Sequence, residues 1–507
     1  MRRAMLGALV FRPCYGFAPR LLLRRRAATL LNDAGRGQQL QSLSLFKQSR
    51  PPSQAYDIPK ELFNRTLRIV AVRVPKDDSN CAATALSSDL LDLPRIKRVV
   101  PPDGDRRSGE RLVLLGDHVT MEHRSLKGLS EKSMRALRAR GHGLLCGCSG
   151  SGDEAATWSP EPYDVALGWE HVTVAEALRR LLPADVEDGA VPSSFEVAGH
   201  VAHLNLRDEL LPHRFLVGAV VLDKNPRLAS VVNKVGAIEC TFRTFDFELL
   251  AGRLDLNVEI VESGCTFRFD YSKVYWNSRL QEEHRRILGL IAKGDIVCDL
   301  FAGVGPFAVP AACRRGAAVL ANDLNPSSAA ALRQAVEVNG GRLEVRDSTS
   351  SRREEGQVVG PPPPGTVRSF NLDAAEFVAA VVSQGVLRPD HVIMNLPAMG
   401  PDFLPALDPW RKAIVVERRK NKSEKKRENH EKSTRPVRVH CYCFVVGSDP
   451  LGEAVATVKS KLSNSSGGDR GGDGASDLLD VAYVHEVRSV APMKTMVCVG
   501  FDLPPLT

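Results

Sequence analysis

The chain has 507 residues, of which 43% are hydrophobic and 25% are charged, and its formal net charge is +8 at pH 7. This length predicts two or three domains with linkers, and no window of about 18 apolar residues marks a membrane span, so we expect a soluble protein without a membrane partner. The net positive charge of the chain suits a polyanionic partner. Part of the charge lies in segments expected to be disordered or cleaved, however, so charge alone does not identify a nucleic acid.

The first 31 residues carry arginines among apolar residues, and the first acidic residue of the chain is Asp33. This pattern is typical of an organelle transit peptide, because in a secretory signal the basic residues precede the apolar run. We therefore expect residues 1–50 to be a transit peptide and the protein to act in the mitochondrial matrix, with nuclear and cytoplasmic pools in addition. The alternative is a disordered basic extension.

The eleven cysteines lack the spacing of a zinc site. The sequence contains no C-x-x-C pair, and several cysteines, such as Cys298 and Cys498, lie in apolar, strand-like runs where a reduced thiol packs as a small hydrophobe. We therefore expect a reducing compartment and no metal centre.

Two smaller units are predicted before the largest domain. Residues 51–140 read as a small α/β domain, and a Gly/Ser/Pro-rich linker at 141–162 separates it from a middle α/β domain at 163–293. A helix opens the middle domain, with Thr173 as its expected cap and Glu176 three residues later.

Strands and helices alternate from residue 294 to 507, which predicts a parallel sheet covered on both faces. Insertions of low complexity near 347–366, 417–436 and 463–476 cannot bury enough apolar surface to become ordered, so we expect exposed loops there. The lysine-rich second insertion is interpreted as a solvated loop, with contact to RNA as the alternative.

The stretch IVCDLFAGVGPFAVPAA, residues 296–312, has the pattern of a strand, a glycine turn and a helix. The strand is expected to end at Asp299, and Gly303 and Gly305 let the backbone approach a ligand before a helix that begins near Pro306. A dinucleotide-binding loop has G-x-G-x-x-G, and Ala308 replaces the third glycine, a substitution that this fingerprint permits. Spacing alone therefore leaves NAD open.

Two further acids follow predicted strands. Asp323 lies twenty residues after Gly303, where a carboxylate can accept hydrogen bonds from ribose hydroxyls, and Asn325-Pro326 then opens the next helix. Asp373 ends another strand and could meet an adenine amino group. Each acid alone is as well explained by a helix cap or a solvated turn, but three acids at successive strand ends favour a nucleoside pocket.

A fourth strand ends in Asn395-Leu396-Pro397, which brings an amide side chain, backbone carbonyls and a rigid proline to the same sheet edge. Such a turn suits a planar amino group that acceptors hold while its neighbour is alkylated. The glycine loop, Asp323 and this turn together resemble the class I S-adenosylmethionine-dependent methyltransferases that modify nucleic-acid bases. The resemblance implies an α/β, Rossmann-like domain with S-adenosyl-L-methionine as cofactor.

Longer motifs make the resemblance more specific. HLNLRDELLPHRFLVGAVVLDKNPRLASVVNK, TFRTFDFELLAG, FDYSKVYWNSRLQEEHRRI and VHEVRSVAPMKTMVCVGFDLP occur in order between about residue 160 and the end. They resemble the tRNA (guanine-N1)-methyltransferase family of archaea and eukaryotes. The resemblance implies methyl transfer to N1 of guanosine at position 37 of tRNA by a monomer, and a small RNA-recognising domain before residue 140, where the match is poor.

The same resemblance implies the site residues. Glu283 aligns with the proposed general base and Arg243 with the group that stabilises charge on O6, while Tyr275 and Asn395 would position the base. The residues implied in cofactor binding are Asp299, Phe301, Gly303, Gly305, Asp323, Asp373, Asn395, Pro397 and His284. From sequence alone, Glu283 fits equally well as an acid that complements a helix dipole, and Arg243 as an ion-pair partner of Asp246 or Glu248.

One departure lies just before Glu283, where relatives have N-P-R-L and this chain has Asn277-Ser278-Arg279-Leu280. The loop loses the stiffness of a proline, which we interpret as a tolerated substitution, while Arg279 remains available for a phosphate.

Three other functions remain open. A related aminocarboxypropyl transferase of wybutosine synthesis would use the same cofactor, and Glu283 with Arg243 favours methylation over it. A noncatalytic tRNA-binding protein would keep the fold without turnover, which the intact motifs disfavour. An NAD-dependent dehydrogenase is disfavoured by the Asn-Leu-Pro turn and by the lack of a hydride-site pattern.

Overall fold

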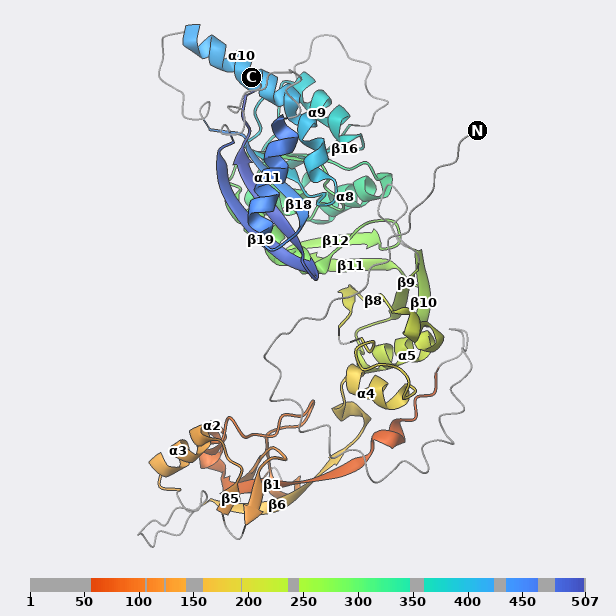
Figure 1. Cartoon of the computed structure of the whole chain (residues 1–507), viewed down its shortest axis with the longest axis vertical. Coiled ribbons are helices and arrows are strands. Elements are labelled where there is room, and N and C mark those ends of the chain that lie inside the picture. The colour runs from red at the N-terminus through yellow and green to blue at the C-terminus, as the bar shows by residue number, and fades with distance from the viewer. Residues whose placement is uncertain are drawn as a thin grey trace, which may run out of the picture.

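The computed structural model describes residues 56–104, 107–122, 125–142, 158–192, 194–235, 246–346, 360–423, 435–463 and 479–505. The expected transit peptide, Arg243, and most of the linker and of the three insertions lie outside these ranges. The described residues form three units that follow one another along the long axis of the molecule (Figure 1).

The first unit is a four-stranded antiparallel sheet with two helices on one face. Its strands, in the order β2-β3-β1-β6, are β2 (Val99–Val100), β3 (Glu110–Leu114), β1 (Arg65–Pro75) and β6 (Ser159–Leu167). The helices are α2 (Ser79–Ala85) and α3 (Glu131–Ala139), and a hairpin joins β4 (Thr120–Glu122) to β5 (Ser125–Lys127). Val70, Val72 and Val74 face the helices, while Ile69 and Ala71 pack in a second cluster on the other face, as the alternation of a strand requires.

The predicted linker at 141–162 overlaps strand β6, so its carboxyl-terminal boundary was wrong. The chain is already a strand at Ser159, paired along its length with β1, so the linker expected at 141–162 is too long at its carboxyl end. Pro160 and Pro162 made this segment look like a linker. Both are tolerated because β6 is an edge strand of the sheet that the described residues form, where one row of backbone amides is not needed for strand pairing.

The middle unit has the sheet order β10-β9-β8-β7. Its elements are β7 (Glu196–Ala198), β8 (Val201–Leu204), β9 (Ser230–Val235), β10 (Asp246–Gly252), α4 (Val174–Leu181) and α5 (Arg214–Lys224), with the short helices η3 (Lys60–Phe63), η7 (Trp169–His171) and η8 (Asp208–His213). Thr173 caps α4: the Glu176 amide donates to its Oγ1 at 3.2 Å, and the Thr173 amide donates to Glu176 Oε2 at 2.8 Å. The expected capping box is confirmed.

The chain enters and leaves the first unit from the middle one. Phe63, just before β1, packs edge-on against Trp169, just after β6, and both belong to the core of the middle unit. The first unit is therefore an insertion carried on two antiparallel strands, visible as the long ribbon β1–β6 in Figure 1.

The third unit is built on an eight-stranded sheet in the order β15-β16-β14-β13-β17-β18-β20-β19. The strands are β13 (Ile296–Asp299), β14 (Ala318–Asn322), β15 (Arg342–Arg346), β16 (Thr366–Phe370), β17 (His391–Met394), β18 (Arg438–Val446), β19 (Val481–Ala491) and β20 (Lys494–Asp502). The pairs from β15 to β18 are parallel, and β20 and β19 join antiparallel. The expected α/β, Rossmann-like fold is confirmed.

Helices cover both faces of this sheet, and an apolar core lies on each side. The helices are α6 (Gln281–Leu290), α7 (Ala308–Arg315), α8 (Pro326–Val338), α9 (Ala374–Ser383), α10 (Asp408–Ser423) and α11 (Pro450–Ser463), with the short helices η9 (Ser278–Leu280) and η11 (Gly400–Leu407). The hairpin β11 (Asn257–Glu262)–β12 (Cys265–Asp270) and α6 share the core of α7 and α8. The middle domain, predicted to reach residue 293, thus ends near Gly252, because the segments after it bury their apolar side chains in the third unit.

Among the described residues, no helix is both long enough and apolar enough to cross a bilayer.

Candidate active site

The glycine turn lies at the carboxyl end of β13, beside the point where the strand order reverses. Gly303 has φ 56° and Gly305 has φ 93°, values that favour glycine. A Cβ on Gly305 would also lie 2.7 Å from Val309 Cγ2, whereas a Cβ on Gly303 would meet nothing within 4 Å. Gly303 therefore leaves free space over the loop, and α7 begins at Ala308, two residues later than expected.

Asp323 is tied to this turn. The amide of Gly303 donates to Asp323 Oδ2 at 2.8 Å, and the amide of Asn325 donates to Oδ1 at 2.9 Å. Burial raises the pKa of Asp323 to about 6, although both amides act against that rise. The second acid of the sequence pattern thus holds the glycine loop, and Asn325 caps α8 as predicted.

Two polar side chains at adjoining strand ends have buried acceptor atoms without a well-formed hydrogen bond among the described residues. They are Asp299, with both carboxylate oxygens, and Asn395, with Oδ1. Burial raises the pKa of Asp299 to about 8, the Phe301 amide offsets part of the rise, and Asp323 adds to it. Because buried acceptors without donors are costly, this edge suits a ligand that brings hydrogen-bond donors or positive charge.

In the Asn395-Leu396-Pro397 turn, two of the backbone carbonyls that were expected to face a ligand already accept hydrogen bonds within the protein. The Leu396 carbonyl accepts from the amides of Met399 and Gly400, and the Pro397 carbonyl accepts from the Phe444 amide at 2.9 Å. These bonds fix the turn against β18. Among the described contacts, Oδ1 of the Asn395 side chain is an acceptor of this turn that has no donor.

The predicted cofactor site includes one more acid and one aromatic residue, Asp373 and Phe301. Asp373 caps α9, where its Oδ1 accepts from the Ala375 amide at 2.8 Å. Asp373 is thus a helix cap, and its contact with an adenine amino group stays a prediction. Phe301 is half-buried in the loop after Asp299 and packs edge-on against Phe403, with ring centroids 5.2 Å apart.

Glu283 lies in the first turn of α6, but its carboxylate is not exposed. Arg286 donates to both of its oxygens at 2.7 Å, and the hydroxyl of Tyr442 donates to Oε1 at 2.6 Å. The side chain of Glu283 is only 3% exposed, and His485 Nε2 lies 3.5 Å from Oε2. Glu283 is therefore a held, buried carboxylate and not a solvated acid at a helix end.

His284 points to another side of α6. Its Nδ1 lies 2.5 Å from Glu262 Oε1, with both residues buried, and its ring packs edge-on against Phe307 with centroids 4.7 Å apart. Phe307 ends the glycine loop, so the structure brings His284 next to that loop, and Glu262 fixes its orientation.

Tyr275, Asn277 and Arg279 lie at the surface before α6. Tyr275 is 47% exposed, and its hydroxyl accepts from the Asn277 amide group at 3.2 Å. Arg279 pairs with Glu196 of the middle unit at 3.3 Å. Asn277 caps η9, since its Oδ1 accepts from the Arg279 amide. Arg243 lies outside the described residues, and Glu248, one of its alternative partners, pairs with Arg214 at 2.9 Å.

Sequence reasoning missed the residues that hold the site together: Arg286, Tyr442, His485, Glu262 and Asn322. Asn322, at the end of β14, is buried and bonds the loops after β13 and β16 through Leu300 and Leu372. Signals existed for His485 and Arg286, which lie in family-like motifs, and Arg286 also follows Glu283 by three residues, the spacing of an ion pair on a helix. Tyr442, Glu262 and Asn322 contact partners further away in the chain, so no local pattern marks them.

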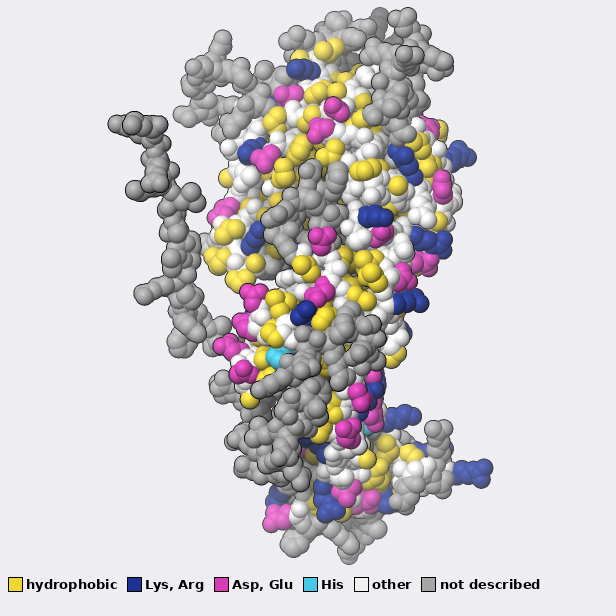
Figure 2. All heavy atoms as spheres, turned by 90° about the vertical axis from the view of Figure 1, so that its right-hand side faces the viewer, with side chains coloured by type: hydrophobic (Ala, Val, Ile, Leu, Met, Phe, Trp, Pro, Cys, Tyr) yellow, Lys and Arg dark blue, Asp and Glu magenta, His cyan; other side chains and the backbone are white. Residues whose placement is uncertain are grey.

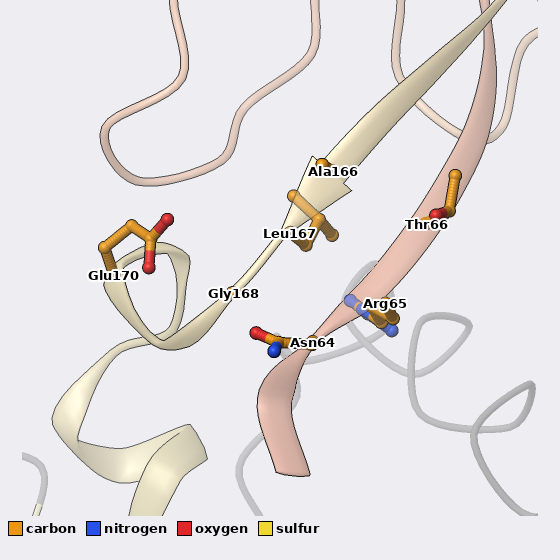
Figure 3. A pocket seen from close by; sticks show the side chains of 7 residues that line it. All are labelled: Asn64, Arg65, Thr66, Ala166, Leu167, Gly168 and Glu170. Atoms are coloured by element: carbon orange, nitrogen blue, oxygen red, sulfur yellow. The ribbon is translucent and has the colours of Figure 1, made fainter. Parts of the chain in front are cut away.

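An open crevice of about 430 Å³ lies elsewhere, where β1 and β6 meet the middle unit (Figure 3). It is lined by Arg65 and Thr66 of β1, by the end of β6 and by Glu170. None of the predicted site residues lines it. On the face shown in Figure 2, Lys and Arg side chains are interspersed with Asp and Glu over the described surface.

Comparison with known proteins agrees with the fold. A TYW2 N-terminal domain model matches residues 174–255, and a TRM5/TYW2 methyltransferase domain model matches residues 258–354. Among solved structures, Trm5b from Pyrococcus abyssi aligns with a TM-score of 0.50 and 20% identity over 86% of this chain and 99% of that one, which supports the fold.

Full-length relatives are more similar in sequence. The tRNA (guanine(37)-N(1))-methyltransferase of Phytophthora infestans is 36% identical over 455 residues, which cover 88% of this chain and 92% of the relative. The one from Danio rerio is 34% identical over 481 residues, covering 91% and 84% respectively. With identity at this level over nearly the whole length of both proteins, the chain belongs to the tRNA (guanine(37)-N(1))-methyltransferase family.

Proposed function

We propose that this chain transfers a methyl group from S-adenosyl-L-methionine to N1 of guanosine at position 37 of tRNA. Family membership supports the activity, and one structural observation supports the site: the buried acceptors of Asp299 and Asn395 at adjoining strand ends. A ligand with an ammonium group and a planar base with N–H donors would satisfy them.

The residues at this edge fit S-adenosylmethionine. Asp299 would accept from its ammonium group, Asp323 from its ribose hydroxyls, and the free space over Gly303 would let the cofactor approach the backbone. When bound, the cofactor supplies a methyl group made electrophilic by its positively charged sulfur. His284, Phe301 and Pro397 border the same loops, and Asp373, which caps α9, would accept a hydrogen bond from the adenine amino group.

The chain's own residues would handle the proton and the charge. N1 of guanine is a poor nucleophile until its proton leaves, and Glu283 is the proposed base for that proton. Charge then builds on O6, where Arg243 would stabilise it, an effect commonly worth about 2.7–4 kcal/mol per donor. Tyr275, which is exposed beside α6, and Asn395 would hold the base in line with the methyl group.

The proposed partner is tRNA with guanosine at position 37, bound by a monomer, and the first unit is the proposed RNA-recognising domain. Its place as an insertion on the β1–β6 ribbon supports that role, because a unit held by two strands can reach a part of the tRNA distant from the reacting base. We also propose the mitochondrial matrix as the main location, with nuclear and cytoplasmic pools. The acid-poor, arginine-containing first 31 residues support it.

The alternative is aminocarboxypropyl transfer in wybutosine synthesis, because one of the matching models covers both kinds of enzyme. The names of the full-length relatives favour methylation. Incubation with labelled S-adenosylmethionine and tRNA transcripts that differ only at position 37, followed by nucleoside mass measurement, tests the proposal. We expect 1-methylguanosine from the G37 transcript alone. An aminocarboxypropyl product, or transfer that ignores position 37, would refute methylation at this site.

A further inference from the structure

The carboxylate of Glu283 is surrounded unevenly by hydrogen-bond donors. Its Oε1 accepts two hydrogen bonds, from Arg286 Nη2 and from the Tyr442 hydroxyl, whereas Oε2 accepts one, from Arg286 Nε. A carboxylate oxygen has two lone pairs directed at donors. Among the contacts of the described residues, Oε2 is thus the oxygen with a lone pair to spare, and a proton taken up by Glu283 would reside there.

A proton on Oε2 has few ways out. The Glu283 side chain is 3% exposed, so bulk water does not reach it readily. Burial acts to lower the pKa of Arg286, but its hydrogen bonds to Glu283 raise that pKa above the ordinary value. Burial also raises the pKa of the Tyr442 hydroxyl well above its ordinary value. Both groups therefore keep their protons and act as donors only.

His485 differs from these two neighbours. Its Nε2 lies 3.5 Å from Glu283 Oε2, and its side chain is 43% exposed. It stands on β19 opposite Cys498 of β20, so the strand pairing fixes its position beside α6. A neutral imidazole has one nitrogen that accepts a proton, and His485 thus connects the buried carboxylate with solvent.

We propose that His485 is the relay through which the proton taken by Glu283 leaves the site after each methyl transfer. The N1–H bond of guanine breaks and an O–H bond forms at Oε2, while the electron pair left on N1 forms the bond to the methyl group, whose bond to sulfur breaks. The O–H proton then passes to Nε2 of His485, and the imidazolium releases one proton to water. The relay rests on the proposed function.

The relay predicts a separation between the first turnover and later ones. As the proposed base, Glu283 takes up one proton in the first methyl transfer, so that transfer needs no exit for the proton, whereas repeated transfer does. His485→Ala should leave the single-turnover rate within about threefold of wild type and lower steady-state turnover by roughly 10²-fold, the lower end of what acid–base groups contribute. A burst of one equivalent should precede the slow phase.

Chemical rescue distinguishes a relay from a structural contact. Imidazole added to His485→Ala should restore steady-state turnover in proportion to its concentration, because it can occupy the solvent-exposed space and carry the proton. His485→Gln keeps a hydrogen-bonding side chain that cannot accept a proton, so it should be as slow as His485→Ala. Glu486→Gln, an exposed neighbour on the same strand, is the matched control and should behave as wild type.

Two results would overturn the relay while wild-type methylation of G37 stands: unchanged steady-state turnover in His485→Ala, or an equal loss in the first and later turnovers that imidazole does not restore. If the wild-type protein itself methylates no G37 transcript, the proposed function fails instead, and the two failures are therefore distinguishable.

Discussion

Gly303 and Asp323 are joined across 20 residues of sequence by a hydrogen bond of 2.8 Å from the glycine amide to the aspartate Oδ2. The bond links the ends of β13 and β14, so the acid that is proposed to bind the ribose also holds the loop that is proposed to admit the cofactor. One substitution should therefore disturb both.

Asp323→Ala should weaken binding of S-adenosylmethionine by about 10- to 100-fold, since hydrogen bonds to charged groups contribute about 1.5–3 kcal/mol. Its affinity for tRNA should stay near wild type, because Asp323 lies under the loop. Calorimetric titration measures the affinity for the cofactor, and filter binding measures the affinity for tRNA. Asp480→Ala, an exposed acid in the same unit, is the control. Equal cofactor affinity in both variants would contradict the role of Asp323.

Burial of Asp299 predicts a pH-dependent stability. Its pKa rises from 3.8 to about 8 on folding, so the folded state binds the proton more tightly than the unfolded state. The stability of the cofactor-free protein should therefore fall as pH rises from about 4 to about 8, and Asp323, whose pKa rises to about 6, adds to the fall in the same direction.

Asp299→Asn removes the larger of these two contributions. The melting temperature of the variant, measured by calorimetry without cofactor, should exceed that of wild type at pH 8, and the difference should shrink towards pH 4. Asp480→Asn, in which an exposed acid is neutralised, should show no such trend. A difference between Asp299→Asn and wild type that stays constant across the pH range would mean that the carboxylate is solvated.

The sequence predicted the sheet edge better than the surroundings of Glu283. Asp299 ends β13, Asn395 follows β17 and Asn325 caps α8, because strand ends and caps follow from short patterns of apolar and polar residues. The Tyr442–Glu283 bond joins residues 159 positions apart. It depends on how α6 packs on β18, and no short pattern encodes that packing. For the same reason β6 was missed: its prolines are acceptable only once its edge position is known.

Tyr442→Phe tests whether the hydrogen bond from Tyr442 to Glu283 matters for the reaction. The change keeps the ring in the core but removes the donor to Oε1, which should cost about 1.5–3 kcal/mol of stability for a bond to a charged group. The carboxylate then has Arg286 as its remaining close donor, and we expect a lower single-turnover rate with unchanged cofactor affinity. Tyr163→Phe on β6 is the control. Loss of stability with a normal rate would make Tyr442 purely structural.

Removal of residues 1–31 tests the proposed mitochondrial location. Without the arginines that stand among apolar residues, a tagged protein should no longer enter mitochondria, while the purified truncated protein should keep its methylation rate. Substituting the arginines of this segment by glutamine at constant length separates charge from length. Unchanged mitochondrial location of both variants, seen by fractionation, would exclude a transit peptide in this segment.

Glu283→Gln tests the proposed base. Glutamine keeps the size and one acceptor but cannot take a proton from N1, and loss of a general base commonly lowers the rate by about 10²–10⁴-fold. Because the proton moves only in the transition state, the single-turnover rate should fall at saturating tRNA and cofactor while both affinities stay near wild type. Single-turnover conditions are required, since slow product release could otherwise conceal the chemical defect.

The neighbouring residue supplies the matched control. Glu282 lies in the same helical turn and also pairs with an arginine, Arg285 at 2.8 Å, but its side chain is 80% exposed. Glu282→Gln should therefore keep the wild-type rate. Loss of the ion pair alone is tested by Arg286→Met, which leaves Glu283 able to accept a proton. If Glu283→Gln reacts at a near-normal rate, Glu283 is the buried partner of Arg286 and Tyr442 and nothing more, and another group must remove the proton from N1.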